Sequence, residues 1–128
     1  MQHRPTSQTL DGNSLAVAQG AFYAVAGAWP LASLGTFEAI TGPKTDHWLV
    51  KTVGTVVGVV GASLALAGLR HRTTADLAVL GAGAAAGLAA IDLVYVARGR
   101  ISAVYLLDAI VEGGIVACWA LSRLGRAR

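Results

Sequence analysis

Three acidic residues and two tyrosines recur at regular positions between residues 91 and 113. They are Asp92, Tyr95, Tyr105, Asp108 and Glu112. The first two acids stand eight residues before and after Arg100, and the two tyrosines stand five residues before and after it. Carboxyl and phenol groups can hold or transfer a proton, and carboxylates can bind a cation. The mirrored spacing therefore raises the hypothesis of one shared site.

Two antiparallel helices joined by a turn near Arg100 would bring these residues together. Eight helical residues rise about 12 Å, so Asp92 and Asp108 should lie at the same depth on the two helices. The tyrosines should also lie level, about one turn nearer the surface. Tyr105, Asp108 and Glu112 share one helix face, and Glu112 lies one turn deeper than Asp108. We therefore expect the three acids to face one another.

The rest of the chain is far more apolar than an average soluble protein. Of its 128 residues, 55% are hydrophobic and 13% are charged. A spanning helix needs about 20 mostly apolar residues. The runs that qualify are 15–34, 48–69, 77–96 and 101–121, with a short interfacial segment at about 33–41. The sequence predicts a single all-α membrane domain over residues 1–128, a bundle of four transmembrane helices arranged as two hairpins.

Carboxylates inside such a bundle need partners. A charged side chain facing lipid costs about 2.5 to 3.5 kcal/mol on insertion scales, so the acids should point inward. Lys51 lies on the same helix side as Gly54 and Gly58, which is expected to face neighbouring helices, and its ammonium could reach the acids. The candidate ligand- or proton-binding residues are Asp92, Asp108, Glu112, Tyr95, Tyr105 and Lys51.

Purely structural roles remain open for all of these residues. Ion pairs that lock two hairpins together also gather acids and bases at one end of a bundle. Lys51 could instead extend its ammonium to lipid headgroups. Tyr95 and Tyr105, like the tryptophans, could belong to interfacial aromatic belts.

Other classes of chemistry find little support in the sequence. Cys118 is the single cysteine, so it can form neither an intrachain disulfide nor a thiolate cluster. His3, His47 and His71 show no metal-ligand spacing, and no phosphate-binding or hydrolase motif is present. We expect no metal, no cofactor and no nucleic-acid partner, and no catalytic residue is assigned.

Local signals predict where helices begin and end. Pro30 should kink the first helix, and Gly42 should stop the short segment that follows. Thr74 is an N-cap candidate for the third helix and Ser102 for the fourth. Thr45 or Asp46 can cap the second. Two GxxxG pairs, Gly54 with Gly58 and Gly83 with Gly87, indicate faces where helices can approach closely.

The distribution of basic residues predicts the orientation. One end of the bundle would hold both termini and the loop after the second helix, with Arg4, Arg70, Arg72, Arg123, Arg126 and Arg128. The other end would hold Lys44, Lys51, Arg98 and Arg100. Basic residues beside spanning helices favour the cytoplasm. We expect a multi-pass protein of the plasma (inner) membrane with both termini cytoplasmic.

The stretch FEAITGPKTDHWLVKTVG, residues 37–54, together with the two-hairpin plan and the acidic fourth helix, resembles small bacterial membrane proteins of the DoxX-like kind. The likeness covers helix number and order over most of the chain, and it carries no active residue onto these positions. The chain is also similar in architecture to sterol-isomerase-like four-helix membrane proteins. That likeness implies intramembrane acids that bind an apolar ligand with a cationic centre.

Three functions fit these observations. In the first, an acidic cavity binds or passes a proton or a cationic or amphipathic small ligand. In the second, the chain is a structural or accessory subunit whose glycine-rich faces pack against copies of itself or a larger membrane partner. In the third, it is an enzyme acting on a lipid or quinone, with Glu112 as general acid or base. Membrane lipids are partners in every case.

Overall fold

The computed structural model describes residues 11–126, and this part of the chain folds into five α-helices without a strand. The helices are α1 (Gly12–Ala32), α2 (Leu34–Thr41), α3 (His47–Leu69), α4 (Ala75–Ala97) and α5 (Tyr105–Arg126). Four of them, α1, α3, α4 and α5, are long and apolar enough to cross a membrane. The predicted all-α bundle of four spanning helices is confirmed, and the chain is a multi-pass membrane protein.

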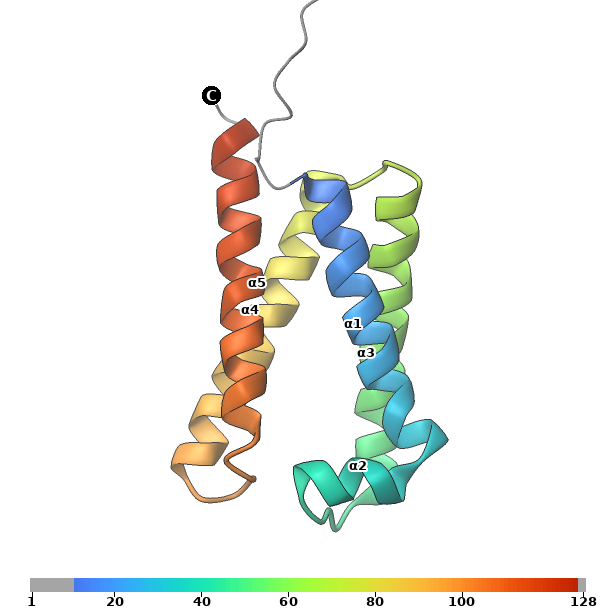
Figure 1. Cartoon of the computed structure of the whole chain (residues 1–128), viewed down its shortest axis with the longest axis vertical. Coiled ribbons are helices and arrows are strands. Elements are labelled where there is room, and N and C mark those ends of the chain that lie inside the picture. The colour runs from blue at the N-terminus through green and yellow to red at the C-terminus, as the bar shows by residue number, and fades with distance from the viewer. Residues whose placement is uncertain (1–10, 127–128) are drawn as a thin grey trace, which may run out of the picture.

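The four long helices form two antiparallel hairpins. Helix α1 packs along α3, and α4 packs along α5. Figure 1 shows the ribbons of the two hairpins close together where α1 begins and α5 ends, and farther apart toward α2. At that second end, the Lys44 ammonium still reaches the Tyr105 ring of the other hairpin. Helix α1 also contacts α5 and α4. It is therefore the helix that joins the two hairpins.

Glycine makes the contact between α1 and α3 unusually close. The glycines at this interface recur every seven residues on both helices: Gly20 and Gly27 on α1, and Gly54, Gly61 and Gly68 on α3. A Cβ atom on Gly54 would lie 2.6 Å from the carbonyl oxygen of Gly27. On Gly61, it would overlap the backbone of Ala24. The absence of side chains thus lets the two backbones touch.

The predicted GxxxG faces differ in outcome. In the first pair, Gly54 faces α1, since its Cβ would strike the Gly27 carbonyl oxygen. The backbone of Gly58 also lies against Gly27, but a Cβ on Gly58 would point into open space. By contrast, no atom lies within 4 Å of a Cβ on Gly83 or on Gly87. This second pair therefore packs against no other helix in the described chain.

Several predicted helix ends are confirmed. Pro30 lies two residues before the end of α1, and α2 then runs as a short separate helix. The Ser33 hydroxyl caps α2 by accepting from the Thr36 N–H, and Gly42 ends it at a φ of 99°. That positive φ suits glycine. At the start of α4, the Thr74 hydroxyl accepts from the Leu77 N–H, as predicted.

Two helix starts differ from the prediction. Helix α5 begins at Tyr105 instead of residue 101, because residues 101–104 form a turn in which the Ser102 hydroxyl accepts from the Val104 N–H. Ser102 therefore stabilises the turn before the helix. Asp46 precedes α3 without a side-chain capping bond. The start of α3 is instead tied to α2 by a contact of 2.8 Å between the His47 Nε2 atom and the Glu38 carboxylate.

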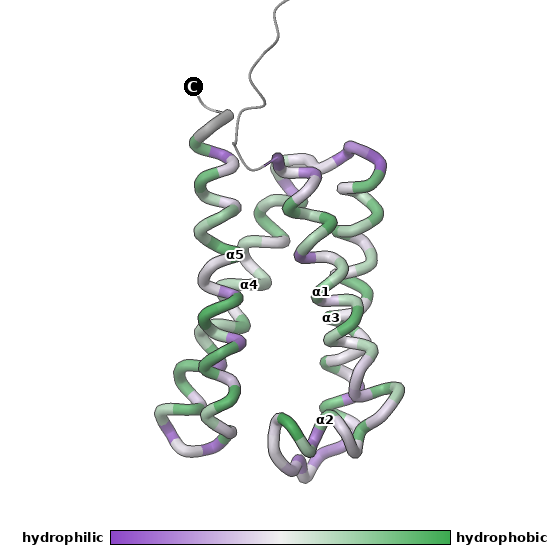
Figure 2. The backbone as a smooth tube through the Cα atoms, in the orientation of Figure 1, coloured by the Kyte–Doolittle hydropathy of each residue, from purple (hydrophilic) through white to green (hydrophobic). Residues whose placement is uncertain are grey.

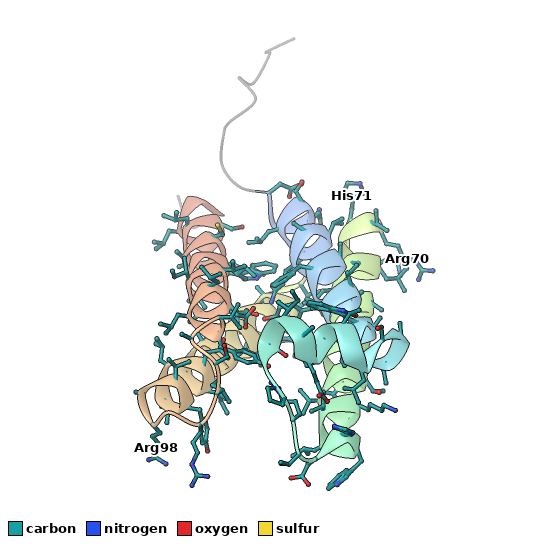
Figure 3. All side chains as sticks on the ribbon, turned by 60° about the horizontal axis from the view of Figure 1, so that its bottom comes forward. Arg70, His71 and Arg98 are labelled. Carbon is teal, nitrogen blue, oxygen red and sulfur yellow. The ribbon has the colours of Figure 1, made fainter. Side chains whose placement is uncertain are left out.

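The two ends of the bundle are polar and its length is apolar, as the hydropathy colours in Figure 2 show. Figure 3 places Arg70 and His71 at the end with the termini and Arg98 at the opposite end. This division agrees with the one used to predict orientation. Arg4 and Arg128, which entered that prediction, lie outside the described residues, and so does the side chain of Arg126.

Candidate functional site

A layer of buried polar side chains joins α1 to the α4–α5 hairpin. The Trp119 indole N–H donates to the Gln19 Oε1 over 2.7 Å, and the Gln19 amide donates to the carbonyl of Gly81 over 2.9 Å. Gln19 is 1% exposed and Trp119 is 2% exposed. A Cβ atom on Gly81 would lie 2.8 Å from the Gln19 Oε1 atom and 2.8 Å from the Trp119 Nε1 atom. Glycine at this position therefore makes room for the bond between Trp119 and Gln19.

One helical turn after Gln19, Tyr23 reaches across to α5. Its hydroxyl donates to the Glu112 carboxyl over 2.5 Å, which is at the short end of the range for a bond to an ionised oxygen. Both side chains are 1% exposed. The deepest acid therefore has a phenol as its partner, supplied by the first spanning helix.

Asp92 and Asp108 meet between α4 and α5. Asp108 lies beside Asp92, close enough for the two carboxyl groups to share a proton. Asp92 is 5% exposed, and its Oδ2 atom has no hydrogen-bond partner among the described residues. Glu112 lies near enough to act on Asp92 electrostatically. We call Asp92, Asp108 and Glu112 the carboxyl cluster.

Lys51 does not join the carboxyl cluster. Its side chain is exposed on α3, and within residues 11–126 no ion pair links it to a carboxylate. The expectation that its ammonium reaches the acids is therefore not met by this geometry. The reason is the rotation of α3, because Gly54, one turn after Lys51, faces α1, and α3 makes its contacts mainly with α1 instead of α4 or α5.

Tyr95 and Tyr105 lie beside cations instead of acids. The Arg98 guanidinium lies 6.0 Å from the centre of the Tyr95 ring, and the Lys44 ammonium lies 5.2 Å from that of Tyr105. Tyr95 is exposed and Tyr105 is half-buried. Neither hydroxyl is bonded to the carboxyl cluster within the described chain. Their position near the helix ends fits the interfacial alternative.

Three residues of this site were not selected from the sequence. Gln19 and Tyr23 had a detectable signal, since they are polar residues four apart in an apolar run and so share one helix face. Trp119 had been grouped with the interfacial tryptophans, but it is buried. Trp119 and Gly81 are equally distant from Arg100 in the sequence, so they should lie level on the two helices. A large residue opposite a glycine is the signal that could have indicated the burial of Trp119.

The carboxyl cluster is arranged as a close pair with a third acid nearby. Among the described residues, no three His, Cys, Asp or Glu side chains converge closely enough to hold a metal ion. Asp92 and Asp108 offer two facing carboxyl groups, and Glu112 is held by Tyr23. The arrangement can share protons or accept one small positive group.

An apolar groove of about 480 Å³ lies between α3 and α4. Its walls include Val56 and Val60 of α3, and Gly83 and Gly87 of α4. Tyr23 also lines it. Tyr23 therefore contacts both the groove and, through its hydroxyl, Glu112 of the carboxyl cluster.

Comparisons with known proteins place the chain in no family. No known protein family, no curated protein and no solved structure matches it.

Proposed function

We propose that this membrane protein binds, or passes across the bilayer, a proton or a cationic or amphipathic small ligand at the carboxyl cluster. The observation that carries this proposal is the burial of Asp92 and Glu112 between spanning helices without a basic partner among the described residues. Acids placed inside a membrane protein are costly unless their charge is compensated. A proton or a ligand cation can supply that compensation.

The arrangement of the cluster supports different tasks for its members. The Asp92 Oδ2 atom is free to accept a new partner, and Asp108 stands beside it. Glu112 is oriented by Tyr23 and is the most deeply placed acid of the three. We expect a cation between Asp92 and Asp108 to displace a proton shared by the two carboxyl groups, so cation binding should release protons.

The proposal includes a location and a direction. Asp92 and Asp108 lie near the turn between α4 and α5, at the end opposite the termini. If the plasma (inner) membrane holds the chain with both termini in the cytoplasm, this pair lies in the outer half of the bilayer. Access from the outer face follows from that orientation.

The two alternatives differ in their support. The accessory-subunit reading relied on free glycine faces, but Gly20, Gly27, Gly54, Gly61 and Gly68 of α1 and α3 are used inside the chain. Of the predicted pairs, Gly58, Gly83 and Gly87 have nothing within 4 Å of a Cβ position and remain open for a partner. The enzyme reading needs Glu112 to face a substrate, whereas Glu112 is 1% exposed and faces Tyr23. We also propose that the chain is related to the DoxX-like membrane proteins.

Binding of tetramethylammonium and dodecyltrimethylammonium tests the proposal. The protein is placed in phosphatidylcholine nanodiscs, and binding is measured by titration calorimetry with empty nanodiscs subtracted. We expect the double variant Asp92→Asn with Asp108→Asn to weaken binding at least about tenfold, since it removes both charges facing the cation. Proton release on binding, measured by repeating the titration in buffers of different ionisation enthalpy, should be lost as well.

Asp76→Asn is the matched control for this experiment. Asp76 is an exposed acid in the first turn of the same helix, so its replacement should leave binding unchanged. Equal binding by the wild type and the double variant would overturn the proposed function. The proposed function would also be overturned if the wild type bound neither cation and its infrared spectra showed no titrating buried carboxyl group.

A further inference from the structure

The groove between α3 and α4 has the character of a site for a hydrocarbon chain. The two helices are joined by a short loop, residues 70–74, yet they make few contacts with each other. The space between them, about 480 Å³, falls within the range of about 300–1,000 Å³ typical of small-molecule pockets. Valines of α3 and the glycines of α4 form its two walls.

The groove offers almost no polar group to a ligand. Thr52 lines it, but its hydroxyl donates to the carbonyl of Trp48 over 2.8 Å. The other hydroxyl in the lining belongs to Tyr23 and donates to Glu112. Both hydroxyl protons are therefore already used, and the groove selects for apolar shape.

The same groove borders the carboxyl cluster at two points. Tyr23 lines the groove, and its hydroxyl donates to Glu112. On α4, Ile91 lines the groove, and the next residue is Asp92, whose buried carboxyl has an unpartnered oxygen. An apolar chain lying in the groove would thus end beside a negatively charged or proton-sharing site.

We infer that the ligand of the carboxyl cluster is an amphiphile with one apolar chain and a cationic head, which enters from the bilayer through the α3–α4 groove. This inference rests on the proposed function and adds the ligand class and the route. The groove holds the chain, and Asp92 with Asp108 holds the head. A lipid with a phosphate head would meet three carboxyl groups, none of which forms an ion pair with a basic side chain among the described residues, and like charges repel.

Filling the groove tests the route without touching the acids. Gly87 lines the groove and has nothing within 4 Å of its Cβ position, so Gly87→Leu can extend a side chain into this open space, and leucine favours a helix more than glycine does. We expect this variant to weaken dodecyltrimethylammonium binding in nanodiscs at least about tenfold, because several methylenes lose their burial site. Tetramethylammonium has no chain, so its affinity should change less than about twofold.

Gly113→Leu is the matched control. Gly113 is exposed on α5, and it too has nothing within 4 Å of its Cβ position, but it does not line the groove. Its replacement should leave both affinities unchanged. Size-exclusion chromatography with light scattering on each variant shows whether Gly87→Leu acts instead by separating two copies of the chain, an outcome that would overturn the chain-binding role of the groove.

The outcomes separate this inference from the proposed function. If Gly87→Leu binds dodecyltrimethylammonium as the wild type does, or if the wild type binds the two cations equally well, the groove is not the ligand route. The loss of binding in the Asp92→Asn with Asp108→Asn variant would still support the carboxyl cluster. If that double variant binds both cations normally, the proposed function fails whatever Gly87→Leu shows.

Discussion

At the scale of single residues, the most informative contact is the bond from Tyr23 to Glu112. A buried acid in a spanning helix is usually balanced by a basic residue, a polar donor or its own proton. Here the donor is a neutral phenol, and both groups are 1% exposed. Glu112 therefore does not serve as a counter-ion for a cation of the described chain, and its charge is not needed to satisfy a neighbour.

Replacement of Glu112 should depend on whether a hydrogen-bond acceptor is kept. Glu112→Gln retains an oxygen that can accept from Tyr23, so we expect the melting temperature in detergent to stay close to that of the wild type. Glu112→Leu leaves the Tyr23 hydroxyl buried without a partner, which costs about 1–3 kcal/mol. Circular dichroism during heating measures both variants.

A large loss of stability in Glu112→Gln would contradict this account. A stranded buried cation typically costs about 3–5 kcal/mol, so such a loss would indicate a basic partner for Glu112. Tyr95→Phe is a suitable control, since it removes the hydroxyl of an exposed tyrosine that is not bonded to the cluster.

The sequence predicted part of this site well. Mirrored spacing within one hairpin was enough to bring Asp92 to Asp108, because both distances are counted from the same turn. It could not bring Tyr23 to Glu112, which are 89 residues apart. Their meeting depends on how α1 is rotated against the second hairpin. The sequence likewise left open whether Lys51 reaches the acids or extends to headgroups, since it does not reveal which neighbour its glycine face contacts.

At the scale of helices, the α1–α3 pair is held by backbone contact. Glycines at intervals of seven residues place bare backbone along one stripe of each helix. Seven residues are close to two turns, so the stripe stays on one face. The helix bounds could be predicted from apolar runs and caps, whereas the tightness of this pair depends on which glycines face inward.

Two alanine substitutions on α3 should therefore have opposite effects. A Cβ on Gly61 would overlap the α1 backbone, so Gly61→Ala should lower the free energy of unfolding by about 1–3 kcal/mol. Gly58, three residues earlier, has nothing within 4 Å of its Cβ position. Gly58→Ala should be neutral or stabilising, because alanine favours a helix by about 1 kcal/mol over glycine in water.

Unfolding by sodium dodecyl sulfate in mixed micelles, followed by circular dichroism, measures both variants. If Gly61→Ala is as stable as Gly58→Ala, the backbones of α1 and α3 do not touch as described. A similar loss in both variants would point to a general need for glycine in α3 instead of a specific contact.

At the scale of the whole molecule, the orientation of the bundle decides which side of the membrane lies nearer to the carboxyl pair. Both described ends of the chain lie on one side of the bundle in Figure 1, opposite the carboxyl pair. Arg70 and Arg72 lie on the side of the termini, and Arg98 and Arg100 lie on the other. The number of spans followed directly from hydropathy. The orientation stays a prediction, because it depends on a small difference in basic residues.

Reporter fusions test that orientation. We expect a fluorescent protein that matures only in the cytoplasm to be active when fused after Arg128, and alkaline phosphatase, which needs the periplasm, to be inactive there. The basic residues near the termini favour retention of that end inside. Phosphatase inserted at Gly99, in the turn between α4 and α5, should show the opposite result. Phosphatase activity at the C-terminus would reverse the orientation and place the carboxyl pair near the cytoplasm.

The bond between α1 and α5 also bears on how the protein is made. The first spanning helix leaves the ribosome with Gln19 and Tyr23 exposed, and their partners Trp119 and Glu112 are synthesised last. Until then, each hairpin carries polar groups into lipid that only the other hairpin can satisfy. The α1–α3 hairpin can form early through its glycine contact, before the α4–α5 hairpin packs against it. Completion of the bundle is therefore the step at which Glu112 meets Tyr23, and a chain cut short before Glu112 would leave the Tyr23 hydroxyl without this partner.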